Sequence, residues 1–242
     1  RGPQSTLFGK NASAGVISIV SKPPSFDLEG SVEATYGNYD AVVLKGYVSG
    51  PITDTVAASI AGGYNRRDGY ITNGFNGDDL NDRNRWFTRG QLLFDNGSNL
   101  TVRLIGDYDE IDEKCCAVAN VAGSLETNLI QSPLIGGQLN DPDAALDDVV
   151  FTNIVPSNRV KNWGGSGQID YEFGDVALTS ITAYRETSLS ANQDVDFYSA
   201  ELASGAQIGE ADIDTFTQEL RLASDFACLL YTSDAADDLT RV

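Results

Sequence analysis

Apolar and polar residues alternate with a period of two along most of this 242-residue chain. Leu100, Val102 and Leu104, for example, alternate with Thr101 and Arg103. Successive side chains of an extended strand point to opposite faces, so this spacing predicts strands with one apolar and one polar face. The pattern predicts a short strand over residues 15–21, and then eight longer strands over residues 29–37, 41–49, 55–70, 85–95, 100–110, 160–173, 176–189 and 213–225. In residues 176–189 the alternation does not decide which face is apolar.

The connections between these strands alternate in length after the first hairpin. Short turns are predicted at 50–54, 95–99 and 174–175, where Gly, Pro, Asn and Asp gather, and long loops are predicted at 73–84, 111–159 and 197–212. Short turns at one end, long loops at the other and aromatic residues near the ends of the apolar faces are typical of an outer-membrane β-barrel. A soluble β-sandwich also alternates, but it seldom needs so long a loop between neighbouring strands. We therefore favour the barrel.

Composition argues against several other functions. The net charge of −19 does not suit nucleic acid or an anionic membrane surface. The absence of His removes the commonest general base and metal ligand. Cys115 and Cys116 are adjacent, which is not the spacing of a zinc site. No phosphate-binding glycine motif or nucleophile elbow is present. We expect no catalysis, no cofactor and no resident metal.

A resemblance to a known family is carried by the first 24 residues, RGPQSTLFGKNASAGVISIVSKPP. This stretch resembles the end of the plug domain in TonB-dependent outer-membrane receptors, where Arg-Gly-Pro, Leu-Phe-Gly, Gly-Val-Ile-x-Ile-Val and Lys-Pro recur at this spacing. The later stretch QELRLAS, which begins at Gln218, resembles a recurring strand of the same family's barrel. The resemblance covers residues 1–226.

The resemblance implies the following organisation. Residues 1–27 would be the end of a plug domain, and residues 28–226 would be about the first eight strands of an antiparallel transmembrane barrel that has 22 in the family. The chain contains no Met, so we expect a signal sequence and most of the plug to lie upstream. Residues 227–242 lack alternation and resemble translated sequencing adapter; we expect them to be a non-native tail.

The implied function is energised uptake of a scarce nutrient complex, most often a ferric siderophore, across the outer membrane of a Gram-negative bacterium. Its partners would be the TonB energy-transducing protein, the siderophore and outer-membrane lipid. Two alternatives stay open: a passive porin, which would lack a plug, and a soluble all-β binding or adhesin domain.

Charged residues on the polar strand faces, together with one plug residue, are candidate contacts between plug and barrel lumen; alternatively they are ordinary solvated residues. These candidates are Arg1, Glu33, Lys45, Arg89, Arg103, Glu219 and Arg221.

Acidic stretches are expected in the extracellular loops. Asp78, Asp79 and Asp82 form one; 107–113 and 141–148 are two more. Carboxylates at close spacing can hold calcium, but none of these stretches has the EF-hand pattern, so we expect solvated loops. The adjacent pair Cys115 and Cys116 lies in the longest loop, where an oxidising exterior would permit a disulfide; two unpaired thiols are the alternative.

Overall fold

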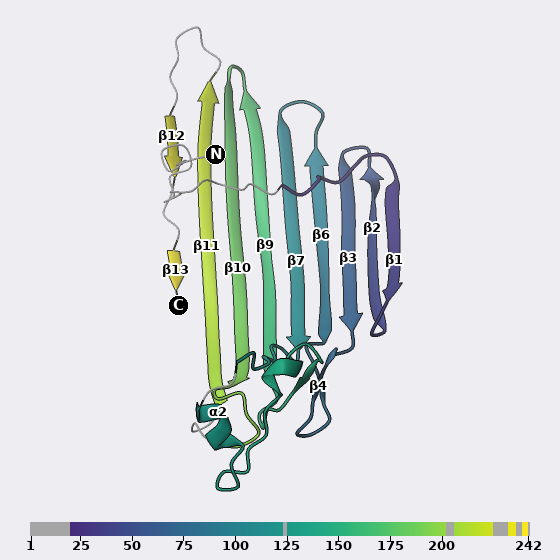
Figure 1. Ribbon diagram of the computed structural model, residues 1–242. Coiled ribbons are helices and arrows are strands. Elements are labelled where there is room, and N and C mark those ends of the chain that lie inside the picture. Colours follow the sequence, from purple (N-terminus) through teal and green to yellow (C-terminus); the bar gives the residue numbers. More distant parts are fainter. Residues whose placement is uncertain (1–19, 123–124, 202–205, 225–231, 236–238, 242) are drawn as a thin grey trace.

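The computed structural model describes residues 20–122, 125–201, 206–224, 232–235 and 239–241. One long antiparallel sheet dominates it (Figure 1). Each of its eight long strands pairs with its sequence neighbour among them, and within the described residues β1 pairs only with β2, so the sheet is open. These strands are β1 (Glu29–Gly37), β2 (Ala41–Thr53), β3 (Val56–Arg67), β6 (Arg83–Asp95), β7 (Leu100–Glu113), β9 (Ser157–Phe173), β10 (Val176–Asp194) and β11 (Ala206–Ser224).

These are the eight strands that the alternation predicts, and the all-β prediction is confirmed. The predicted strand over 15–21 falls mostly outside the described residues. Two short strands, β12 (Thr232–Ala235) and β13 (Leu239–Arg241), pair with β11 and lie in the segment that we expected to be non-native.

Several predicted boundaries are wrong. The turn expected at 50–54 is shorter, because β2 continues through Pro51 to Thr53 with a register shift that accommodates the proline. The sequence 107–113 is part of β7 and not of a loop. Residues 206–212, expected in a loop, belong to β11 and pair with the extended end of β10.

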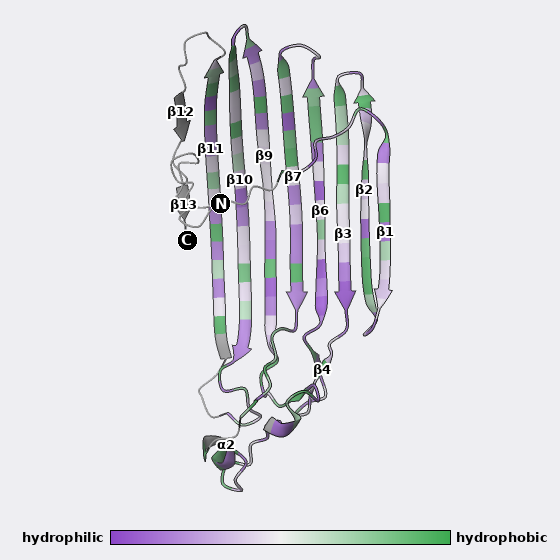
Figure 2. Cartoon of the chain, turned by 45° about the horizontal axis from the view of Figure 1, so that its top comes forward, coloured by the Kyte–Doolittle hydropathy of each residue, from purple (hydrophilic) through white to green (hydrophobic). Residues whose placement is uncertain are grey.

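The register places apolar side chains of neighbouring strands on one face. Leu92 pairs with Leu104, and Val102 pairs with Ile169. Figure 2 shows the resulting alternation along the strands, which become hydrophilic toward the end that carries the long loops. The leucine and isoleucine residues of this face are 45–50% exposed at these positions, so no described part of the chain covers it.

Aromatic side chains mark both ends of the apolar face. Toward the long loops, Trp86 stacks on Tyr108 with ring centroids 4.9 Å apart, and the Trp163 and Tyr184 centroids are 5.5 Å apart. Near the short turns, Tyr171 and Phe173 lie 5.7 Å apart. Aromatic girdles of this kind border the lipid-facing band of outer-membrane barrels.

The long loops form a small unit of their own below the sheet in Figure 1. It contains a three-stranded sheet in the order β5 (Asp79–Leu80), β4 (Ile71–Asn73) and β8 (Val149–Val150). The loop after β7 adds α2 (Leu125–Ile130) and a 3-10 turn, η1 (Pro142–Ala144). Among the described residues, no helix has the length and apolarity that a membrane crossing requires.

Leu104 lies midway along the apolar face of β7, so we expect Leu104→Arg to destabilise the barrel by about 2–4 kcal/mol, the cost of a guanidinium at mid-bilayer. Gln168→Arg is the matched control, because Gln168 lies on the polar face of β9 beside Asp170 and pairs in register with Arg103. Urea titration of the full-length protein in lipid vesicles measures both. Equal costs for the two variants would contradict the assignment of faces.

Candidate functional site

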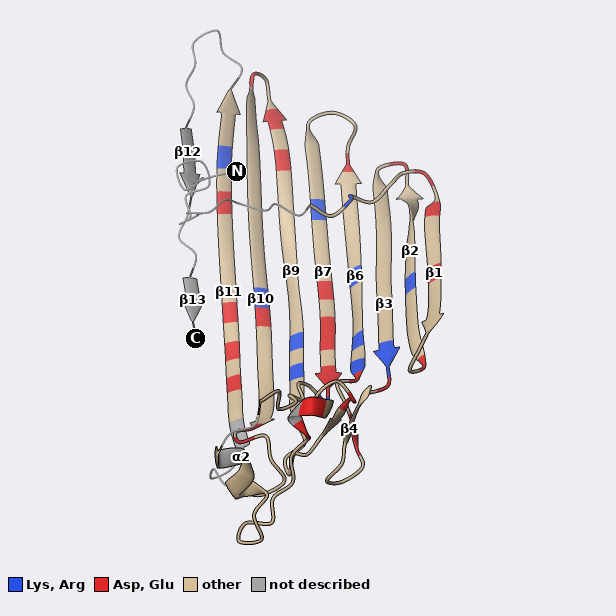
Figure 3. Ribbon diagram, in the orientation of Figure 1, with Lys and Arg blue, Asp and Glu red and all other residues tan. Residues whose placement is uncertain are grey.

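Residues 20–28, here called the linker, lie across the polar face of the sheet. Figure 1 shows the chain passing in front of β7 and β6 before it enters β1. Figure 3 marks basic residues on β6 and β7 near this crossing. The polar face therefore holds a segment of the chain that precedes the first strand.

Two arginines of the sheet bind the start of the linker. Arg89 on β6 donates from Nη1 to the Ser21 hydroxyl (2.7 Å). Arg103 on β7 donates from Nη2 to the Ser21 carbonyl oxygen (2.8 Å) and to that of Lys22 (3.3 Å). Gln91 adds a bond from Nε2 to the Lys22 carbonyl oxygen (3.3 Å). Because most of these bonds end on backbone oxygens, they fix the path of the linker whatever its side chains are.

Asp107 orients one of these arginines. Its carboxylate, whose side chain is only 12% exposed, lies 3.5 Å from Nη2 of Arg89 and accepts two bonds from Arg185 on β10 (2.9 and 3.0 Å). Arg103, in contrast, has no carboxylate partner among the described residues; its Nε donates to Oε1 of Gln91 (3.1 Å). An arginine without an ion pair gains its hydrogen bonds from amide and backbone oxygens, which suits it to hold the linker.

The linker is also attached to β1 and β2. Lys22 is ion-paired with Glu29, which also accepts a bond from the Tyr47 hydroxyl (3.0 Å). The hydrogen bond to Glu29 raises the pKa of the Lys22 ammonium above its ordinary value. The backbone N–H of Ser25 donates to the buried hydroxyl of Ser49 (2.8 Å). The linker is thus held at Ser21, Lys22 and Ser25.

The other predicted lumen residues pair among themselves. Lys45 lies 3.0 Å from Glu33 on the neighbouring strand, and Arg221 pairs with Glu219 on its own strand. Neither pair contacts the linker in the described part of the chain. Arg1 lies outside the described residues.

Sequence reasoning missed three residues of this site. Gln91 is uncharged and did not stand out from other polar residues. Asp107 falls on the polar face of the predicted strand over 100–110, but it was also counted among the acidic loop residues and was not singled out as a partner of the arginines. Arg185 lies in β10, where both faces carry apolar residues: Leu178 lies on one and Ile181 on the other.

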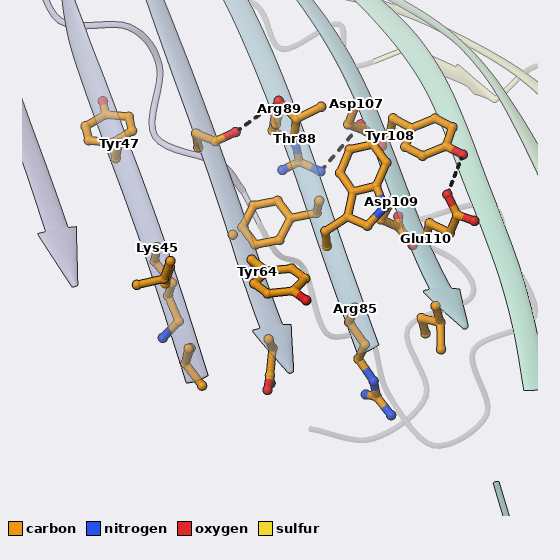
Figure 4. A pocket seen from close by; sticks show the side chains of 18 of the residues that line it. Lys45, Tyr47, Tyr64, Arg85, Thr88, Arg89, Asp107, Tyr108, Asp109 and Glu110 are labelled. Atoms are coloured by element: carbon orange, nitrogen blue, oxygen red, sulfur yellow. Dashed lines mark hydrogen bonds and ion pairs between the residues drawn. The ribbon is translucent and has the colours of Figure 1, made fainter. Parts of the chain in front are cut away.

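A cavity of about 650 Å³ lies on the polar face between the linker and the long loops. Figure 4 shows Lys45, Tyr47, Arg85 and Arg89 around it. The Arg85 guanidinium is ion-paired with Glu113, which is 2% exposed. A cavity of this size is in the range of small-molecule sites, which is roughly 300–1,000 Å³.

The acidic residues predicted in the loops make contacts within the loop unit. Asp78 is ion-paired with Lys114 (3.3 Å), and Asp82 accepts a bond from the Lys114 backbone N–H (2.6 Å). Asp79 lies in β5. Among the described residues, no group of three or more Asp, Glu or Cys is placed to hold a metal ion. A disulfide joins the two adjacent cysteines, Cys115 and Cys116.

One buried side chain joins two long loops. Asn73, which is fully buried, donates from Nδ2 to the Thr152 carbonyl oxygen (2.8 Å) and accepts from the Thr152 backbone N–H (3.1 Å). Thr152 in turn donates its hydroxyl to Asp194 at the end of β10. Ile71, together with Leu80 and Val150, forms the apolar core beside this network. Two long loops and the end of β10 are thereby joined into one unit.

Comparison with known proteins gives consistent matches. No protein-family model matches the chain. The pesticin receptor of Yersinia pestis is 43% identical over 54 residues, which are 22% of this chain and 8% of that receptor. The ferrioxamine B receptor of Salmonella typhimurium is 36% identical over 64 residues, 26% of this chain and 9% of the receptor. The matched segments therefore span less than a tenth of these relatives.

Solved structures match almost the whole chain. The ferric yersiniabactin uptake receptor FyuA of Yersinia pestis superposes with a TM-score of 0.74 at 20% identity, over 95% of this chain and 33% of FyuA. The ferric-catecholate import receptor Fiu of E. coli gives 0.68 at 15% identity, over 94% and 33%. The described residues therefore share the barrel fold of these two proteins over about a third of their length. The resemblance to TonB-dependent receptors noted in the sequence is confirmed, and the soluble alternative is not favoured.

In such a barrel the polar face lines the lumen, so the arginines hold the linker against the lumen wall. We expect Arg89→Met together with Arg103→Met to release it, because every bond from these two guanidinium groups to Ser21 and Lys22 is lost. A spin label at position 20 of the full-length receptor should then become more mobile by electron paramagnetic resonance. Lys45→Met is the control, since Lys45 pairs with Glu33 and not with the linker. An unchanged spectrum in the double variant would contradict this account.

We expect Asn73→Ala to separate the loops, because it leaves buried groups of Thr152 without partners at about 1–3 kcal/mol each. Amide hydrogen exchange in 71–73 and 149–152 should accelerate at least tenfold. Asn76→Ala is the control, because Asn76 is exposed and bonds only to nearby Asp78. Similar exchange in the two variants would mean that Asn73 does not join the loops.

Proposed function

We propose that the protein belongs to a receptor in the outer membrane of a Gram-negative bacterium that imports a ferric siderophore with energy supplied through TonB. The match to a siderophore-receptor barrel over 95% of the chain is the observation that carries this proposal. The names of the relatives support the ligand class, since they include a ferrioxamine B receptor and a ferric yersiniabactin uptake receptor. We expect the siderophore to be passed on chemically unchanged.

Residues 1–27 are proposed to be the end of the plug and residues 28–226 the first part of the barrel. The linker contacts support this division, because a segment that precedes β1 lies on the face that lines the lumen. Force from TonB would reach the plug from upstream. The linker bonds to Arg89, Arg103 and Ser49 would hold the downstream end of the plug in place during this movement, so that a passage opens and the plug stays attached to the wall.

The loop unit and the cavity would serve the ligand. The loops joined by Asn73 stand at the proposed extracellular end and would move as one body when a siderophore arrives. The cavity lies between these loops and the linker, on the side from which the ligand would enter. We also propose that four barrel residues contact the part of the plug that precedes the linker in the sequence. These residues are Glu33, Lys45, Glu219 and Arg221.

Iron supply tests the proposal directly. The full-length gene is expressed in a Gram-negative host that lacks its own siderophore receptors and is grown on ferric siderophores as the iron source. We expect growth that stops when the TonB gene is deleted, because transport needs energy from the inner membrane. Uptake of small sugars that is independent of TonB would indicate the passive porin instead. No iron uptake with any siderophore would overturn the proposed function.

A further inference from the structure

One buried carboxyl group lies where the long loops meet the sheet. It belongs to Asp194, the last residue of β10, which is only 4% exposed. Its Oδ2 lies against the hydroxyl of Thr152, in the loop after β7, and its Oδ1 accepts a hydrogen bond from the Asp196 backbone N–H (3.2 Å). A buried carboxylate is costly unless a cation or enough hydrogen-bond donors compensate its charge.

The Thr152 hydroxyl lies between two oxygen atoms but carries only one hydrogen. Besides Asp194 it contacts the Ile154 carbonyl oxygen, 2.8 Å away, which can only accept. When Asp194 is ionised, the hydroxyl donates to it, and the Ile154 oxygen faces a lone pair of Thr152. When Asp194 is protonated, its O–H donates to Thr152, whose hydroxyl then donates to Ile154. Only the protonated acid supplies a hydrogen to every contact in this chain.

In the described part of the chain, no cation is paired with Asp194. The charged group that acts on it is Asp196, a like charge two positions further on. The segment 149–156 contains no acidic or basic residue, and β11 places Ala206 opposite Asp194 in register. Charged side chains of the adjoining segments bond elsewhere: Lys114 to Asp78, Glu113 to Arg85, Arg159 to Asp112 and Glu201 to Asn153.

These surroundings favour the protonated acid. Burial raises the pKa of Asp194 above its ordinary value and the charge of Asp196 raises it further, while the hydrogen bond to Thr152 acts in the opposite direction without outweighing them. An acid of this kind stabilises the joined loops fully below the ordinary value, about 3.9 for Asp, where it is protonated whether the loops are joined or apart. The stabilisation is lost as the pH rises through the raised pKa.

We propose that Asp194 is a pH-sensitive joint of the loop unit: its protonated side chain completes the hydrogen bonds to Thr152 and Ile154, and its ionised side chain loosens them. The loop after β7 is therefore joined to β10 more firmly in an acidic medium than in a neutral one. Asn73 links the backbone of Thr152 to the loop after β3, so the change reaches that loop as well. The inference goes beyond the proposed function, because it does not depend on what the receptor imports.

Amide hydrogen exchange of the full-length receptor in detergent tests this over a series of pH values, with each rate corrected for the intrinsic pH dependence of exchange. We expect protection in residues 149–154 to fall as the pH rises above about 3.9, tenfold for each pH unit up to the raised pKa, and then to level off. Asp194→Asn should stay protected at every pH, because its neutral amide donates an N–H to Thr152 as the protonated acid does.

Two further variants separate Asp194 from the other carboxylates. Asp196→Asn removes the like charge, so protection should level off at a lower pH and the total loss should be smaller. Asp79→Asn changes an exposed carboxylate in β5 of the same loop unit and should leave the pH dependence as it is. Protection of the amides in the middle of β7 shows whether each variant keeps its sheet.

Protection of residues 149–154 that does not change with pH, or that falls with pH in Asp194→Asn as it does in the unaltered receptor, would overturn the inference. Loss of the pH dependence in Asp79→Asn would overturn it too, because the effect would then not belong to Asp194. None of these measurements involves iron uptake, so their failure leaves the proposed function standing.

Discussion

Backbone hydrogen bonding is the constraint on which this structure depends. In lipid every N–H and C=O group needs a partner within the protein, and paired strands provide one for each group inside the sheet. The long ladders from β1 to β11 meet this need, and the period of two follows from it. In the proposed outer-membrane barrel, lipid would cover one face of the sheet, so the side chains on that face can be apolar without a protein core. This explains why the large apolar residues here are exposed and why the buried apolar residues belong mostly to the loop unit.

The same strand geometry leaves the other face of the sheet to polar and charged side chains. Residues on the polar face would not contact lipid, so they can be charged. Their partners lie on a neighbouring strand, one strand spacing away. Asp107 shows the result: it faces Arg89 in register and also reaches Arg185 two strands further. A carboxylate shared between two arginines leaves each guanidinium with spare donors. Arg89 uses one of them for Ser21. The linker is therefore held by residues whose positions the sheet already fixes.

Alternation predicted the eight strands and the faces of Arg89 and Arg103, because both follow from local spacing. It failed where polar residues fill both faces of a strand that extends beyond the apolar band. Asp112 was predicted to lie in a loop and Glu110 at the last position of a strand, yet both pair across the ladder, with Arg159 and Lys161 respectively. Alternation could not predict the role of Arg185 or the Asn73–Thr152 hydrogen bond, for another reason. The two residues of that bond are 79 positions apart, and no local pattern links a loop amide to its partner.

The contrast between Phe87 and Trp86 shows what register adds to composition. These adjacent residues of β6 are about equally exposed, at 43% and 41%. Trp86 points to the apolar face, where it stacks on Tyr108 in the aromatic band that borders the lipid. Phe87 points to the lumen, where the surroundings are charged pairs and Gly63. Lipid accounts for the exposure of the first ring but not of the second. The register of β6, and not the residue type, therefore decides that one ring belongs to the aromatic band and the other to the polar face.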